Sequence, residues 1–164
     1  MLAIEIVNLG VRATPGQNPN PDYPKDQIDA VIALVKDICA RQGIRPDHVL
    51  GHSDIAPQRK VDPGPRFPWK RLADEGLIPW PAASAVAARL GSYQAVLPDP
   101  AWFQARLTEI GYETPRNGLL DGPTRSVLAA FQMKYRPARY DGQPDAETAA
   151  MLDVLAAQPP MPIH

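Results

Sequence analysis

The stretch LAIEIVN, residues 2–8, decides the predicted fold class. A continuous run of branched apolar residues is typical of a strand buried inside a sheet. A second apolar segment, HVLGH at residues 48–52, predicts a neighbouring strand. Between them, residues 25–42 carry apolar side chains at the spacing of one buried helix stripe, and Gly43 suits the end of that helix. We therefore predict an α/β domain that contains part of a mixed sheet.

A central strand at the start of a sequence is unusual, because it needs neighbours on both edges. The residues that follow offer few candidate strands, so we expect the domain to include sequence upstream of Met1. Glu5 lies inside this run, where a buried carboxylate without a partner is costly. It is either an edge residue that reaches water or a general base whose pKa is tuned by apolar surroundings.

The rest of the chain divides by composition. Residues 1–80 form the predicted α/β part, and residues 81–98 are Ala- and Ser-rich and predict a linker with a short helix near residues 84–90. Residues 99–157 predict a small all-α domain of three helices, each introduced by an aspartate that suits an N-cap. A D-G-x-T segment and a D-G-x-x-D segment in this part indicate a weak internal repeat.

Composition excludes several classes of protein. Prolines and glycines make 31 of the 164 residues, which favours long ordered loops. The 17 basic and 18 acidic residues divide evenly between the two halves, which argues against binding nucleic acid by neutralising phosphates. No apolar run approaches the ~20 residues of a membrane span. The single cysteine, Cys39, cannot form an internal disulfide and reads as a small core residue.

The chemistry lies in the loop that begins GHSDIAPQRKVDPG at Gly51. His52 ends the predicted second strand, and Asp62 follows ten residues later before a Pro-Gly pair, so a stiff loop can return both to one point. An imidazole and a carboxylate suit zinc with an open position for water, and Lys60 is placed to stabilise an oxyanion. A solvated charge cluster on a surface loop explains the same spacing.

The longer string GHSDIAPQRKVDPGPRFPW, residues 51–69, resembles the zinc-binding motif of N-acetylmuramoyl-L-alanine amidases of the AmiD and AmpD type, related to phage T7 lysozyme. IEIVN, residues 4–8, looks like the catalytic strand of that family. Residues 99–155, with FQMKYRP and YDGQPDAET, look like its helical peptidoglycan-binding domain. The resemblance covers most of the chain and rests on the order and spacing of these motifs.

The resemblance implies hydrolysis of the amide between N-acetylmuramic acid and L-alanine of peptidoglycan or muropeptides. His52 and Asp62 match two ligands of Zn²⁺, Glu5 matches the residue that activates the metal-bound water, and Lys60 matches the basic residue that stabilises the tetrahedral intermediate. No other cofactor is implied. The first residues show no pattern of a signal peptide, which leaves the location open, and the resemblance implies the cell envelope or periplasm.

The family has a third zinc ligand, a histidine on a strand upstream of the IEIVN segment. Neither His48, which shares a predicted strand with His52, nor His164, beyond the second domain, suits that role. We therefore expect weak zinc binding and little turnover in this chain as it stands, with activity restored by an upstream segment. A non-catalytic peptidoglycan-binding protein, or a structural module whose loop only resembles the motif, remains the alternative.

Overall fold

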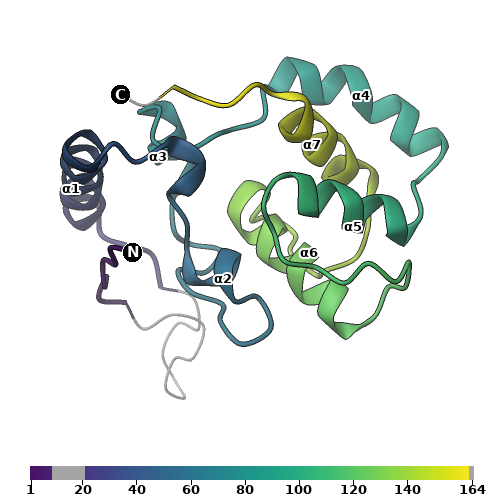
Figure 1. The fold of residues 1–164 in the computed structure, drawn as a ribbon, viewed down its shortest axis with the longest axis horizontal. Helices are drawn as coiled ribbons and strands as arrows, with labels where there is room; N and C mark the ends of the chain where they lie inside the picture. Colours follow the sequence, from purple (N-terminus) through teal and green to yellow (C-terminus); the bar gives the residue numbers. More distant parts are fainter. Residues whose placement is uncertain (9–20, 163–164) are drawn as a thin grey trace.

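The computed structural model describes residues 1–8 and 21–162. Its elements are helices throughout these ranges, and they run across the molecule from α1 to the α4–α7 group (Figure 1). In chain order they are α1 (Lys25–Gln42), the 3-10 helix η1 (Pro46–His48), α2 (His52–Ile55), α3 (Trp69–Asp74), α4 (Ala83–Ala95), α5 (Pro100–Glu109), α6 (Gly122–Tyr135) and α7 (Ala146–Ala157). None of the helices in the described part is long and apolar enough to cross a membrane.

The predicted mixed sheet is wrong, because the described residues contain no strand. Residues 2–8 keep the alternation of a strand, with Ile4 and Ile6 packed against the N-terminal core and Glu5 exposed. A strand also needs a neighbour for its backbone hydrogen bonds. No second strand lies in the described ranges, and the Val7 carbonyl instead accepts a hydrogen bond of 2.8 Å from the Gln27 side chain.

The second predicted strand, residues 48–52, is also wrong, because local turn and cap chemistry decides its conformation. Pro46 occupies the first turn of η1, where proline is favoured. Gly51 then precedes α2, and its backbone N–H donates to the Asp54 carboxylate at 2.9 Å. Only a few apolar residues lie between η1 and α2. They are too few to form a strand, because helical turns begin on both sides of them.

The predicted helix at residues 25–42 is confirmed as α1, and it carries the N-terminal core. Gly43 ends it in the left-handed conformation, with φ of 61°, which favours glycine. The core residues come from α1, α3 and the segments beside them. They are Ile28, Val31, Ile32, Val35, Phe67, Trp69, Leu72, Leu77 and Ile78.

The C-terminal core lies among α5, α6 and α7, the three helices predicted there. Each begins at an aspartate whose side chain accepts a backbone N–H three residues on: Asp99 from Trp102, Asp121 from Thr124 and Asp145 from Thr148. These contacts satisfy N–H groups that a helix start leaves without a partner.

The segment predicted as a linker contains α4, which is longer than the short helix expected there. This alanine-rich helix packs along α7 (Figure 1). An ion pair of 2.9 Å joins its Arg89 to Asp153. Alanine has the highest helix propensity, which explains a helix with no fully buried residue. The division into domains at residues 1–80 and 99–157 stays a prediction.

A repeated hydrogen-bond arrangement underlies the weak internal repeat. In the first copy, the buried Gln104 accepts from the Gly118 N–H at 2.9 Å and donates to Thr124 Oγ1 at 2.9 Å. In the second, the buried Gln132 accepts from the Gly142 N–H at 2.9 Å and donates to Thr148 Oγ1 at 3.1 Å. Each glutamine thus fastens one helix to the loop and helix that follow it.

Trp80 joins the two halves of the molecule. It packs against both the N-terminal and the C-terminal core, with its ring centroid 5.1 Å from that of Tyr135 in α6. Its carbonyl accepts a hydrogen bond of 3.1 Å from Gln158, just after α7. The two cores therefore share a side chain at their boundary.

Candidate active site

His52 and Asp62 meet at the two ends of one loop. The Ser53 N–H donates to the Asp62 carbonyl at 2.9 Å, which closes the loop. His52 Nδ1 then lies 2.5 Å from Asp62 Oδ2. Their side chains are 42% and 53% exposed, so both are accessible from solvent. The structure thus brings together the two residues for which the sequence predicted convergence, while their role as metal ligands stays a prediction.

The spacing of the pair differs from the one we expected. Two donors on one zinc ion, each ~2.0–2.2 Å from the metal, should lie roughly 3–4 Å apart. The measured 2.5 Å is a direct contact between imidazole and carboxylate. The residue types suit zinc, and the two side chains must separate slightly to share it.

The backbone beside His52 is closely packed, which requires glycine at position 51. A Cβ on Gly51 would lie 2.7 Å from Cδ of Pro63 and 3.1 Å from the Trp69 ring. The first of these distances is closer than real Cβ contacts come. The start of α2 therefore rests directly on the residue that follows Asp62 and on the N-terminal core.

Tyr23 is a neighbour of the pair that sequence reasoning missed. Its hydroxyl donates to the Pro63 carbonyl at 2.8 Å. Partial burial, together with the negative charge of Asp62, raises the pKa of the Tyr23 hydroxyl. A tyrosine in a proline-rich stretch 40 residues from Pro63 carries no local signal of this position.

The other two predicted site residues are not joined to the pair. Glu5 and Lys60 are both exposed, and within residues 1–8 and 21–162 neither forms a hydrogen bond or ion pair with His52 or Asp62. The exposed Glu5 therefore fits the first of the two readings left open by the sequence, a residue that reaches water, and its role as a general base stays a prediction. The described part of the chain also contains no group of three or more residues of metal-binding type.

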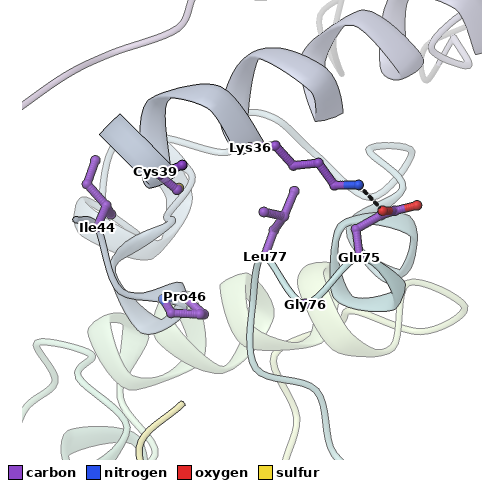
Figure 2. A pocket seen from close by; sticks show the side chains of 8 residues that line it. Lys36, Cys39, Ile44, Pro46, Glu75, Gly76 and Leu77 are labelled. Carbon is purple, nitrogen blue, oxygen red and sulfur yellow. Dashed lines mark hydrogen bonds and ion pairs between the residues drawn. The ribbon is translucent and has the colours of Figure 1, made fainter. Parts of the chain in front are cut away.

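A pocket of about 260 Å³ lies away from the pair, between the end of α1 and the segment after α3. Figure 2 shows Cys39, Ile44, Pro46 and Leu77 around it, with the ion pair of Lys36 and Glu75 at one side. Its lining is mainly apolar and does not include His52 or Asp62. The pocket therefore does not form part of the candidate active site.

Comparison with known proteins gives two family matches, over different parts of the chain. Residues 1–65 match the family described as N-acetylmuramoyl-L-alanine amidase, and residues 97–152 match the putative peptidoglycan binding domain. The resemblance to this amidase family is confirmed. The first match includes all four predicted site residues, and the second covers most of α5, α6 and α7.

Individual amidases give the same result. The N-acetylmuramoyl-L-alanine amidase AmiD of Escherichia coli is 41% identical over 160 residues, which are 94% of this chain and 56% of AmiD. The solved complex of AmiD with anhydro-N-acetylmuramic acid-L-Ala-D-gamma-Glu-L-Lys superposes with a TM-score of 0.73 over 82% of this chain and 52% of that one. The crystal structure of AmpDH3 of Pseudomonas aeruginosa is 40% identical, with a TM-score of 0.77 over 83% of this chain and 54% of that one. The chain thus spans about half the length of these relatives.

Proposed function

We propose that this chain carries the chemistry of a zinc-dependent N-acetylmuramoyl-L-alanine amidase, which hydrolyses the amide between N-acetylmuramic acid and L-alanine of peptidoglycan. The observation that carries the proposal is the His52–Asp62 pair, 2.5 Å apart and exposed, inside the region that matches the amidase family. Imidazole nitrogen and carboxylate oxygen are both ligands that zinc prefers. Their exposure leaves room for a substrate and for further ligands.

The proposed roles follow from the chemistry of amide hydrolysis. His52 and Asp62 would hold the zinc ion, and zinc would supply a bound water of lowered pKa. Glu5 would take a proton from the attacking water as the general base, once it approaches the pair. Lys60 offers a positive charge to the oxygen that becomes negative in the tetrahedral intermediate. Both side chains are exposed, so their approach to the pair is not blocked by burial.

We propose peptidoglycan or its muropeptides as the ligand of the helical part, residues 97–152. The match to a putative peptidoglycan binding domain supports this for the helical part, and the ligands of the relatives support muropeptides as ligands of the chain as a whole. AmiD and AmpDH3 were both solved with anhydromuramic peptides. Such a ligand also implies a location in the cell envelope or periplasm.

A second candidate is a peptidoglycan-binding protein without catalysis. The observation that favours it is the metal-ligand count, because the described residues bring only the two predicted ligands together. Two protein ligands hold zinc less firmly than the three of a typical catalytic site.

Zinc titration of the full chain by calorimetry separates the two candidates, with His48→Ala as the matched control for His52→Ala. His48 is exposed, lies four residues from His52 in the sequence and makes no contact with Asp62. We expect weak zinc binding by the wild type and by His48→Ala, because only two protein ligands are present, and its loss in His52→Ala. Stem-peptide release from peptidoglycan is measured on the same samples with saturating zinc.

Zinc-dependent release that falls about 10²–10⁴-fold in Glu5→Gln, with zinc still bound, supports the amidase and the role of its base. Muropeptide binding without zinc binding or release supports the second candidate and rejects the first. Absence of both zinc and muropeptide binding rejects both candidates.

A further inference from the structure

Asp54, two residues after His52, lies in a buried cluster that spans the molecule. Its carboxylate accepts from the Tyr112 hydroxyl at 2.7 Å, from Lys134 Nζ at 2.9 Å and from the Gly51 N–H at 2.9 Å. The side chains of Asp54 and Lys134 are only 4% and 5% exposed. Asp54 therefore belongs to α2, while two of its three partners come from the C-terminal half: Tyr112 from the segment after α5 and Lys134 from α6.

Lys134 contacts the surroundings of His52 from a second direction. Its ammonium lies 4.4 Å from the centre of the Trp69 ring, and that ring packs against Gly51. A cation over a tryptophan face is attracted by the negative face of the ring. One side chain of α6 thus contacts both Asp54, inside α2, and the aromatic residue beneath the start of α2.

The loop between His52 and Asp62 has another anchor on the same helix. Gln58 Nε2 donates to the Pro123 carbonyl, near the start of α6, at 2.9 Å. Figure 1 shows α2 and its loop facing α6, and the two helices are in contact. The loop is therefore held by α6 at both ends of that helix, through Pro123 and Lys134.

The charges of the cluster depend on one another. Burial opposes the positive charge of Lys134, but Tyr135 and Asp54 outweigh it and raise the lysine pKa. Burial and the nearby Asp54 carboxylate raise the pKa of Tyr112 well above its usual value, so Tyr112 stays a hydrogen-bond donor. Removal of either partner leaves a buried carboxylate with fewer partners, which is strongly unfavourable.

From these contacts we infer that Lys134 and Tyr112 are positioning residues for the candidate site: they hold Asp54, and thereby α2, so that His52 faces Asp62. The inference rests on the proposed function only for the chemical role of His52. It makes the helical part a structural support of the active-site loop, in addition to any ligand that it binds.

NMR of the full chain without metal tests the inference. The nuclear Overhauser effect between the His52 ring protons and the Asp62 Hβ protons reports the pair directly, well below the unfolding temperature. We expect it to weaken in Tyr112→Phe, which removes one hydroxyl, and to be lost in Lys134→Met. Thr148→Val is the matched control, because Thr148 is fully buried in the same helical part but does not contact Asp54.

Zinc titration of the same variants gives a second readout. We expect the dissociation constant to rise about tenfold in Lys134→Met, as for other residues that orient a ligand, and to stay unchanged in Thr148→Val. Tyr112→Phe keeps the test decisive if Lys134→Met does not fold. A wild-type Overhauser effect in folded Tyr112→Phe, or an equal loss in Thr148→Val, overturns the inference. Absence of zinc binding in the wild type counts against the proposed function alone, because the Overhauser effect needs no metal.

Discussion

The helices of the two halves start in different ways. In the C-terminal half, α5, α6 and α7 each begin at an aspartate that accepts a backbone N–H. In the N-terminal half, α1 and α3 begin after prolines and have no side-chain cap. The starts of the C-terminal helices are therefore fixed by local side-chain contacts. The starts of α1 and α3 depend on packing against the rest of the molecule.

The side chains of the C-terminal core are more completely buried than those of the N-terminal core. Phe103, Leu107 and Leu128 of the C-terminal core are each 0% exposed. Val31, Ile32 and Val35 of α1 each keep 8% of their surface exposed. A side chain that is more completely buried loses more stabilisation when it is truncated, because more of its surface was removed from water. We expect the C-terminal core to contribute more to the free energy of unfolding.

Truncation of one leucine in each core gives the largest effect. Leu128 is 0% exposed and Leu77 is 6% exposed. Leu→Ala changes in cores cost about 2–5 kcal/mol, and we expect Leu128→Ala near the top of that range and Leu77→Ala near the bottom. Urea unfolding followed by circular dichroism measures both. An equal or larger loss in Leu77→Ala would contradict the difference between the cores.

Removal of a single hydroxyl from each half has an intermediate effect. Thr148→Val leaves a buried N–H of Gln132 without its acceptor, which costs about 1–3 kcal/mol. Tyr23→Phe removes a partly buried hydrogen bond to Pro63, worth about 0.5–1.5 kcal/mol. The same unfolding measurement ranks them. A greater loss in Tyr23→Phe would show that the loop beside the candidate site is the more tightly held.

Exchange of helix caps has the smallest effect. Asp121→Ala removes the cap of α6 and should cost about 1 kcal/mol. The residue before α4, Ala82, has an extended backbone and no side-chain cap, so Ala82→Asp should add stability, near ~0.5 kcal/mol because α4 is exposed. Thermal unfolding of the two variants checks the opposite signs. A loss of stability in Ala82→Asp would indicate that the start of α4 does not accept a cap.

The helices could be predicted because their signals are local. Each signal lies within a few residues of the structure that it specifies. The signals are a capping aspartate at the helix start, a glycine after the helix end and a periodic apolar stripe along the helix. A strand at residues 2–8 could not be predicted from local signals. A strand forms only when a second strand, often distant in the sequence, pairs with its backbone. Residues 2–8 retain the alternating burial of a strand, but no strand in the described ranges pairs with them.

In the candidate site, too, only the features with a local sequence signal could be predicted. His52 and Asp62 were recognisable from a motif that spans only their own loop. The partners of Asp54 were not, because Tyr112 and Lys134 lie 58 and 80 residues away. Nothing near either residue in the sequence marks it as a contact of that loop, and only the packing of the C-terminal half against α2 brings them together.

The three tryptophans lie in three different parts of the molecule, so intrinsic fluorescence can report on each part. Trp69 sits in the N-terminal core beside the Lys134 ammonium, Trp80 lies at the boundary of the cores, and Trp102 packs against Tyr93 with ring centroids 5.4 Å apart. Indole emission shifts when the ring meets water. Chains that retain one tryptophan at a time therefore allow fluorescence to follow the active-site support, the boundary and the helical part separately during unfolding or ligand binding.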